Sequence, residues 1–414
     1  MTPTVALLGT LDTKETEYAY LRDRLRAQGA EVLLIDVGVR APRALVPDVP
    51  RTEVAAAGGA DSAALEAGND RGSAVAAMAA GAAVVLRRLY DEGRVQGALA
   101  AGGSGNTTIA AQAMRALPVG VPKLVVSTMA GGDVSHYVGG SDLAIMPAVT
   151  DVAGVNRVSA RVLSNAAAAL AGMVAAPAVE VPGDRPLVGA TMFGVTTPAV
   201  DEARRLLEER GYEVLVFHAT GTGGRALEAL VQDGFLAGVL DLTTTELCDE
   251  LVGGVLTAGP DRLRAAGAAG VPQVVSLGAL DMVNFGPVAT VPPAFRDRQL
   301  YEHNASVTLM RTTADECAAL GREIAEKLSA AQGPTTVLIP RRGLSALDTD
   351  GQPFRDEAAD EALFAALRDG LGDRVELVEL DLHVNDPAFA AAAVDRLDAH
   401  VRAAGTTPTE GASA

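Results

Sequence analysis

Short apolar runs and longer amphipathic segments alternate along the first part of the chain. Residues 5–8 form an apolar run that predicts a buried strand, and residues 32–37 predict the next strand. Between them, apolar residues recur at helical spacing, so we expect a helix over 15–28 that ends at Gly29. A strand, a helix and a second strand in this order predict a βαβ unit, in which ligands bind beside the carboxyl ends of the strands.

The alternation continues to about residue 175. Residues 42–68 are rich in proline and small residues, and we expect them to form irregular loops. Residues 176–186 contain three prolines and a glycine and are predicted to form a linker. The remaining pattern predicts a long alanine-rich helix over 71–92, a strand at 98–101, a helix over 109–117, a strand at 123–127 and a helix over 151–175.

After the linker the pattern starts again. The runs Gly29-Ala-Glu-Val-Leu-Leu-Ile and Gly211-Tyr-Glu-Val-Leu-Val-Phe fall in corresponding places, and two further pairs of glycine-led runs match in the same order. Three ordered matches predict a diverged duplication. We therefore expect an α/β protein of two tandem Rossmann-like domains with mostly parallel sheets and an inter-domain cleft. The expected segments are a domain at 1–180, a domain at 185–405 and a flexible tail at 406–414.

A glycine-rich turn follows the predicted strand at 98–101. A strand, a glycine turn and a helix bring backbone N–H groups and the positive end of a helix to one point, and such a point binds phosphate. The turn matches neither G-x-G-x-x-G nor G-x-x-x-x-G-K-[ST], so an ordinary βα turn is the alternative. The expected contacts are the backbone N–H and hydroxyl groups of Gly102, Gly103, Ser104, Gly105, Asn106 and Thr107.

Other loops at predicted strand ends offer further contacts to a phosphorylated ligand. Lys14 could neutralise phosphate charge, with a solvated helix start capped by Asp12 as the alternative. Residues that follow the strand at 123–127 could meet a base or ribose, or could simply turn the chain. A second glycine turn carries Arg225, which could hold a phosphate or carboxylate through two hydrogen bonds. These further candidates are Asp12, Lys14, Thr128, Met129, Thr220, Gly221, Gly223, Gly224 and Arg225.

Acidic residues and a histidine of the second half follow apparent strand ends or lie in loops. Oxygen ligands suit Mg²⁺, and we assign Asp241 and Glu246 to that role. A carboxylate beside a histidine suits acid/base catalysis, and we assign Asp281, Glu302 and His303 to it. A surface or capping role is the alternative for each residue alone. The sequence has no H-E-x-x-H, C-x-x-C or G-x-S-x-G, which argues against a zinc hydrolase, a redox enzyme and a serine hydrolase.

Composition limits the partners that the protein can bind. The 414-residue chain has a formal net charge of −18, which argues against nonspecific nucleic-acid binding and against anionic membrane surfaces. A nucleotide needs only a local positive site. Apolar runs are interrupted well short of a membrane span. The two cysteines match no metal or redox spacing, and no basic signal-peptide region precedes residues 5–8, so we expect a cytoplasmic protein.

Several motifs of the chain occur together in one order. They are G-T-L-D-T-K, A-G-G-S-G-N-T-T, V-S-T-M-A-G-G-D-V, H-A-T-G-T-G-G-R, L-D-L-T-T-T-E-L, L-D-M-V-N-F-G-P and H-N-A-S-V-T-L-M-R-T-T. From Val5 to about Ala404 the chain thereby resembles the family typified by the ATP-binding N-terminal region of the tomato mosaic virus resistance protein. That resemblance implies two Rossmann-like subdomains with ATP and Mg²⁺ bound between them.

The resemblance also implies a partner and one local difference. The plant protein carries a further TIM-barrel-like domain, and for this chain the resemblance leads us to expect a separate barrel protein as the partner. The glycine turn reads G-G-S-G-N-T where the family has G-G-S-G-G-T. Asparagine tolerates a left-handed φ, so we expect the turn to persist at Asn106.

Three functions remain open at this point. The first is a protein that binds ATP with Mg²⁺ in the inter-domain cleft. The second is an enzyme that acts on a small phosphorylated or carboxylated metabolite through acid/base residues of the second domain. The third is a regulatory or assembly module whose ligand controls a partner. Long alanine-rich helices and α/β precedents favour a homo-oligomer in each case.

Overall fold

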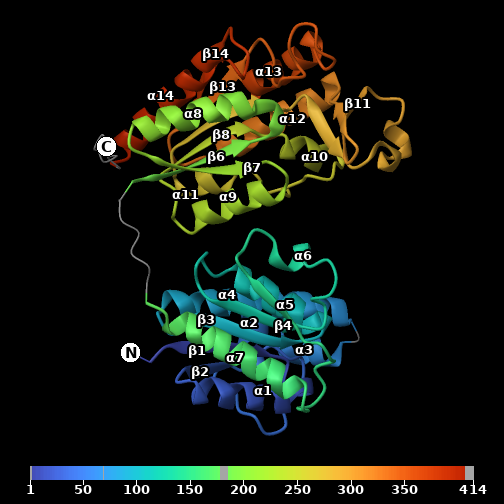
Figure 1. Cartoon of the computed structure of the whole chain (residues 1–414), viewed down its shortest axis with the longest axis vertical. Coiled ribbons are helices and arrows are strands. Elements are labelled where there is room, and N and C mark those ends of the chain that lie inside the picture. The colour runs from blue at the N-terminus through green and yellow to red at the C-terminus, as the bar shows by residue number, and fades with distance from the viewer. Residues whose placement is uncertain (1, 69, 178–184, 406–414) are drawn as a thin grey trace. The chain divides into compact units, whose positions relative to one another are not determined.

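The computed structural model describes residues 2–68, 70–177 and 185–405, and the chain divides into two compact units, residues 1–180 and 181–414 (Figure 1). Each unit is a parallel sheet with helices packed on both faces. The predicted α/β class with mostly parallel sheets is therefore confirmed. Most of the predicted linker at 176–186, and the whole predicted tail at 406–414, lie outside the described residues.

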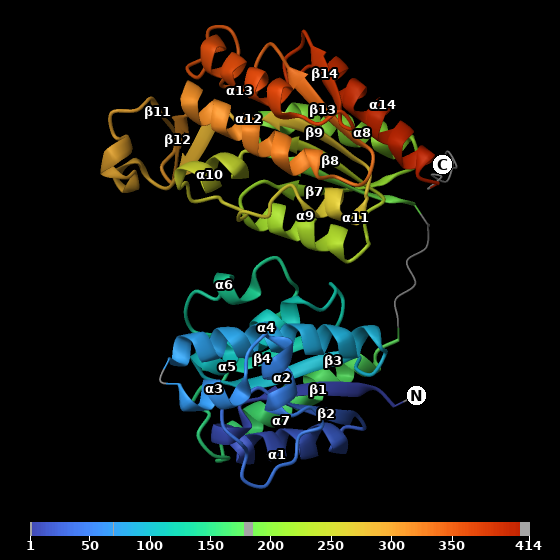
Figure 2. The same cartoon turned by 180° about the vertical axis from the view of Figure 1, so that it is seen from behind.

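The elements of the N-terminal unit are β1 Thr4–Gly9, α1 Leu11–Ala27, β2 Glu31–Asp36, α2 Arg51–Ala57, α3 Ser62–Ala67, α4 Arg71–Asp91, β3 Gly97–Gly102, α5 Ser104–Arg115, β4 Lys123–Ser127, α6 Ser135–Val138, β5 Ala144–Pro147 and α7 Ser159–Ala175. The strands are all parallel, in the order β2-β1-β3-β4-β5. Strand residues alternate between two hydrophobic cores, one with α1 and α7 and the other with α2, α4 and α5 (Figure 2).

This strand order creates a switch point between β1 and β3. The chain leaves β1 through α1 on one face and returns to β3 through α4 on the other face. The loops that follow the two strands therefore diverge, and the crevice between them is where open α/β sheets bind ligands. The fold thus directs attention to the loops after β1 and β3.

Two expectations for the N-terminal unit are wrong. Residues 42–68, expected to be irregular, contain α2 and α3, and α2 is held by the buried Val54 and Ala55. The helix expected over 151–175 begins only at Ser159. Both errors arise in stretches of small residues, where apolar periodicity is weak.

Among the described helices, α4 alone has the length and apolar composition of a membrane span. Its buried residues pack against β-strand side chains in the core that it shares with α2 and α5. The apolar composition of α4 is therefore that of a helix packed in the core of the unit.

The elements of the C-terminal unit are β6 Leu187–Met192, η1 Gly194–Thr196, α8 Thr197–Glu209, β7 Glu213–His218, α9 Thr222–Gln232, β8 Gly238–Thr243, α10 Glu246–Val252, α11 Ala265–Ala269, β9 Gln273–Gly278, β10 Met282–Phe285, η2 Val288–Thr290, η3 Pro293–Phe295, β11 Leu300–Asn304, β12 Val307–Arg311, α12 Ala314–Ser329, β13 Thr335–Pro340, α13 Glu357–Gly370, β14 Glu376–Leu380 and α14 Pro387–Ala403. Six parallel strands lie in the order β14-β13-β9-β8-β6-β7. Read from β7, the first five follow the order of the N-terminal sheet. A three-stranded antiparallel sheet, β10-β12-β11, is added between β9 and α12.

Candidate functional site

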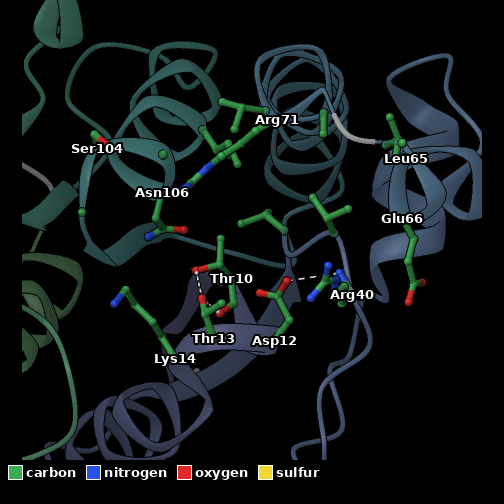
Figure 3. A pocket seen from close by; sticks show the side chains of 18 of the residues that line it. Thr10, Asp12, Thr13, Lys14, Arg40, Leu65, Glu66, Arg71, Ser104 and Asn106 are labelled. Atoms are coloured by element: carbon green, nitrogen blue, oxygen red, sulfur yellow. Dashed lines mark hydrogen bonds between the residues drawn. The ribbon is translucent and has the colours of Figure 1, made fainter.

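A cavity of about 650 Å³, the first cavity, lies beside the carboxyl ends of β1, β2 and β3 in the N-terminal unit (Figure 3). The loop after β1 contributes Asp12 and Lys14, and the turn after β3 contributes residues 103–106. The structure therefore brings together two sets of predicted ligand contacts that are about 90 residues apart in the sequence. Because the cavity opens at the switch point between β1 and β3, it occupies the place where sheets of this order bind ligands.

The turn after β3, here called the first glycine turn (Gly102–Asn106), leaves the start of α5 open. Gly103 is the N-cap residue and has no side chain with which to cap the helix. A Cβ added to Gly103 would meet only the Thr128 hydroxyl, at 3.7 Å, so the backbone remains accessible. The side chain of Ser104 is exposed and lines the cavity. The first N–H groups of a helix lack intrahelical partners, so these groups are available to an anion.

Two arginines that sequence reasoning missed approach the same space. Arg71 begins α4 and extends toward the first turn of α5, and Arg40 lies across the cavity near Asp12 (Figure 3). A Cβ added to Gly105 would lie 3.6 Å from Nη2 of Arg71. Within the described ranges, neither guanidinium group has a hydrogen bond or ion pair with another side chain or the backbone. Arg71 therefore approaches the open helix start, and Arg40 adds a second positive group to the same cavity.

Three other charged side chains that line this cavity form hydrogen bonds or ion pairs within the protein. The Lys14 ammonium group donates a hydrogen bond to the Val152 carbonyl oxygen, and Lys14 itself has non-helical backbone angles that kink α1. Glu66 pairs with Arg51 at 3.0 Å, and Asp70 caps α4 through the backbone N–H groups of residues 72 and 73. These two carboxylates are thereby held by partners other than a ligand.

Asp12 differs from the other carboxylates at the cavity. Its Oδ2 accepts a hydrogen bond from the backbone N–H of Arg40 at 3.2 Å, whereas its buried Oδ1 has no hydrogen-bond partner among the described residues. The N-cap residue of α1 is Thr10, so the alternative of an Asp12 cap is wrong. Asp36 accepts hydrogen bonds from the backbone N–H groups of Leu11 and Gly38, and burial raises its pKa to about 6. Asp36 thereby joins the loops after β1 and β2.

Asn106 and Thr107 have structural roles that the sequence did not indicate. The turn between β3 and α5 persists as expected, but Asn106 lies in the first turn of α5 and does not adopt a left-handed φ. Its buried amide group donates to the Tyr18 hydroxyl at 2.9 Å and to the Ala101 carbonyl at 3.0 Å. The Thr107 hydroxyl contacts the Gly103 carbonyl and the Ser127 hydroxyl, so it is committed within the protein.

Thr128 and Met129 do not line the first cavity. Thr128 lines a second cavity of about 520 Å³ beside the ends of β4 and β5. Met129 is exposed and lines neither cavity, so the structure gives no support to its assignment as a ligand contact.

The second glycine turn (Gly221–Gly224) is filled by the protein itself. Oε1 of Glu246 accepts hydrogen bonds from the backbone N–H groups of Gly221 at 2.6 Å and Gly224 at 3.0 Å. A Cβ added to Gly224 would lie 2.1 Å from Glu246 Oε2, so glycine is needed for this internal contact. Arg225 donates to the Thr257 carbonyl oxygen at 2.8 Å. The turn predicted to bind an anion over Thr220 to Arg225 thus holds the carboxylate of Glu246, a side chain of the protein itself.

The predicted magnesium ligands Asp241 and Glu246 form ion pairs with an arginine. Arg262 is almost fully buried and contacts Asp241 Oδ1 at 2.7 Å through Nη2 and Glu246 Oε2 at 2.7 Å through Nε. Glu228 adds a third carboxylate at 3.3 Å. A metal ion bound to these carboxylates would displace the Arg262 guanidinium group. The guanidinium group would then be a buried charge without a partner, which is strongly destabilising. Over the described residues, no group of three or more His, Cys, Asp or Glu side chains is arranged to hold a metal ion.

The predicted acid/base residues are not gathered into one site. Asp281 is fully buried, its Oδ2 accepts a hydrogen bond from the Ser345 hydroxyl, and burial together with the charge of Asp348 raises its pKa to about 7. Glu302 and His303 are exposed on β11, which pairs with β12 along one side only and contains a bulge. The structure therefore places two of the predicted residues at the surface and the third in the core.

Sequence reasoning found the first glycine turn and missed Arg40, Arg71 and Arg262. Arg40 follows the strand β2, so its position at a carboxyl end was a usable signal. Arg71 begins a helix on the opposite face from α1, and no local pattern connects it with the turn. Arg262 lies between α10 and α11, outside any regular element.

Comparison with known proteins identifies the family. Residues 3–178 match the N-terminal domain, and residues 185–401 the C-terminal domain, of the uncharacterised protein family UPF0261. A UPF0261 protein of Clostridium tetani is 50% identical over 398 residues, which are 96% of this chain and 98% of that protein. The ToMV resistance protein Tm-1(GCR237) of Solanum lycopersicum is 46% identical over 332 residues, which are 78% of this chain and 44% of the plant protein.

Solved structures give a weaker match. A crystal structure of UDP-N-acetylglucosamine 2-epimerase is 12% identical and matches 66% of this chain and 79% of that chain with a TM-score of 0.24. A TM-score of this size supports no inference about this protein. The two family domains and the bacterial and plant relatives agree with the resemblance expected from the motifs, and the chain belongs to the uncharacterised protein family UPF0261.

Proposed function

We propose that the N-terminal unit binds a nucleoside triphosphate, ATP with Mg²⁺, in the first cavity. The phosphates lie against the first turn of α5 and between the guanidinium groups of Arg40 and Arg71. The observation that carries this proposal is a cavity that joins an uncapped helix start to two arginines, neither of which has a partner for its guanidinium group among the described residues. In a chain of net charge −18, a polyanion needs such a local positive site.

The size and place of the cavity support the same ligand. A volume of about 650 Å³ is typical of small-molecule and cofactor sites. The switch point places the open helix start at its rim, as in other α/β nucleotide sites. The motifs shared with the family of the plant resistance protein imply ATP as the nucleotide.

Asp12 fits a magnesium ion that accompanies the phosphates. Its Oδ1 has no partner within the described ranges, and the residue lines the first cavity. Mg²⁺ is commonly held by one or two carboxylates together with phosphate oxygens and water. Asp12 would hold the ion, which would neutralise phosphate charge next to this carboxylate. This assignment replaces Asp241 and Glu246.

Calorimetric titration of the full chain with ATP and Mg²⁺ tests the proposal. We expect Arg71→Gln to weaken binding about tenfold, because a charged hydrogen bond contributes roughly 1.5–3 kcal/mol. Arg26→Gln is the matched control, since it removes the same charge about 18 Å from Lys14 along α1. Equal losses in the two variants would show that only net charge matters. Absence of ATP binding to the unaltered chain would overturn the proposal.

Asp12→Asn tests the assignment of the ion. We expect this variant to bind ATP without Mg²⁺ at least as tightly as the unaltered chain, because a carboxylate that repels phosphate is gone. Added Mg²⁺ should then strengthen binding much less than it does in the unaltered chain. Titrations of both proteins with and without Mg²⁺ give the comparison. The same Mg²⁺ dependence in both would remove Asp12 from the site.

A further inference from the structure

The second cavity lies on the other side of the first glycine turn. It has a volume of about 520 Å³ and is lined by Ser127, Thr128, Gly131 and residues 147–151. These residues follow β4 and β5, whereas the first cavity lies over β1 and β3. Neighbouring strands are about 4.8 Å apart, so β1 and β4 are separated by only about 10 Å. One extended ligand can therefore reach both cavities.

The loops around the two cavities contact each other at two points. The Thr128 backbone N–H donates to the Gly102 carbonyl oxygen at 3.1 Å, and a Cβ on Gly103 would approach the Thr128 hydroxyl. The loop after β5 is tied to α1, because the Lys14 ammonium group donates to the Val152 carbonyl and the Gly154 N–H donates to Glu17. The lysine at the first cavity thus contacts the loop that walls the second.

The second cavity differs from the first in its chemistry. None of its lining residues is an arginine or lysine, so it offers no charged donor to phosphate. It presents the hydroxyl groups of Thr128 and Thr150, the carboxylate of Asp151 and an apolar wall that includes Val149. An apolar wall with a few polar groups suits a planar base and its ribose, whose hydroxyl groups can donate to a carboxylate.

Val149 adds an observation that points to a built site. Its side chain is 76% exposed, and its φ of 67° lies in the left-handed region, which β-branched residues rarely adopt. Because Val149 is exposed, burial of its side chain does not compensate for the strained backbone. Strained backbone of this kind tends to occur in loops that bind ligands. In this loop it directs the chain from β5 back toward Lys14.

We propose that the second cavity is the nucleoside subsite of the ligand whose phosphates occupy the first cavity. This inference rests on the proposed function. The first glycine turn then separates the two parts of one molecule, with the anionic part on the side of Arg71 and the base and ribose on the side of Thr128. A Cβ on Gly103 would meet only the Thr128 hydroxyl, at 3.7 Å, so this glycine leaves both sides of the turn open.

Two probes separate the subsites: ATP, and inorganic tripolyphosphate, which has no nucleoside. We expect Thr128→Trp to fill the second cavity and weaken ATP binding about tenfold, while tripolyphosphate binding changes less than about twofold. Met129→Trp is the matched control, because it adds the same bulk one residue later, outside both cavities. It should leave the affinity for both probes unchanged. Circular dichroism and thermal unfolding establish that the variants are folded.

The outcomes distinguish this inference from the proposal on which it rests. Equal weakening of ATP and tripolyphosphate by Thr128→Trp would show that the second cavity is not a separate subsite. Unchanged ATP affinity in a folded Thr128→Trp variant would also overturn the inference, and both results would leave phosphate binding at the first cavity intact. Absence of binding of either probe to the unaltered chain would overturn the proposed function itself.

Discussion

The two units each carry a glycine turn that leads into a helix, and the turns hold different partners. In the N-terminal unit, the uncapped start of α5 opens to a cavity with Arg40 and Arg71. In the C-terminal unit, the start of α9 holds the carboxylate of Glu246, which Arg262 neutralises. Similar local sequences therefore give an accessible anion site in one unit and an internally satisfied helix start in the other.

The difference shows that a glycine pattern predicts the backbone geometry of a turn, but not whether a ligand or a side chain of the protein binds there. Glycine permits a close approach to the helix start, whether the approaching anion is a ligand or a side chain. After β8, the C-terminal unit has three threonines and then Glu246, where the N-terminal unit has Gly103 and Ser104 after β3. Among the described residues, an acidic side chain accepts hydrogen bonds from the second glycine turn but not from the start of α5. The proposed function depends on this difference.

The largest expected effect comes from removing the internal anion. We expect Glu246→Ala to lower the free energy of unfolding by about 3–5 kcal/mol, because it leaves the buried Nε–H of Arg262 and two backbone N–H groups without their acceptor, although Asp241 still pairs with the guanidinium group. Urea unfolding of the full chain measures the loss. Glu302→Ala, at an exposed carboxylate, is the control and should change little. A loss no larger than that of the control would contradict the internal role of Glu246.

The converse change gives the N-terminal turn an anion of its own. Gly103→Asp should fold, because φ is −85° and the only near neighbour of an added Cβ is the Thr128 hydroxyl. We expect ATP affinity to fall about a hundredfold through repulsion at the helix start. Gly103→Asn is the matched control, with the same shape and no charge. Equal affinities of the two variants, measured by calorimetry, would show that no phosphate lies near Gly103.

A smaller effect concerns the pH dependence of the C-terminal unit, where buried carboxyl groups cluster. Burial and the charge of Asp348 raise the pKa of Asp281 to about 7 and that of Asp360 to about 8. A carboxyl group whose pKa is raised on folding binds a proton more tightly in the folded state. Its stabilising contribution is present at low pH and is lost as the pH rises through the folded-state pKa.

Asp281→Asn imitates the protonated form and keeps an acceptor for Ser345. We expect the stability advantage of this variant over the unaltered chain to grow by roughly 2–3 kcal/mol between pH 5 and pH 9, because the unaltered chain loses stability as the pH rises from the unfolded-state pKa of Asp281 to its folded-state pKa of about 7. Thermal unfolding across this pH range gives the measurement. Parallel stability curves for the two proteins would mean that Asp281 does not keep its proton in the folded state.

The sequence predicted the architecture well because each unit repeats a strong local pattern. Apolar runs such as 5–8 and 123–127 lie close to the observed β1 and β4, and the glycine turn at 102–106 was identified from its place between a strand and a helix. Helix starts in small-residue stretches, as at Ser159, were less well defined because alanine and glycine give no periodic signal.

The composition of the site could be predicted only in part. Contacts such as Asp12 and Ser104 follow strand ends, so the parallel sheet brings them to one edge. Arg262 lies in the irregular stretch between α10 and α11, so the sequence did not indicate its ion pairs with Asp241 and Glu246. These two carboxylates, expected to bind Mg²⁺, instead pair with an arginine. Asn106 was interpreted from its backbone preference, whereas its role is set by Tyr18, which is 88 residues away in the sequence.

The most direct test is a crystal structure of the full chain with ATP and Mg²⁺ bound. We predict that phosphate oxygens lie within hydrogen-bond distance of the backbone N–H groups at the start of α5 and of the Arg40 and Arg71 guanidinium groups, while Glu246 remains on the second glycine turn. A triphosphate bound at Gly221–Gly224 with Glu246 displaced would contradict this prediction.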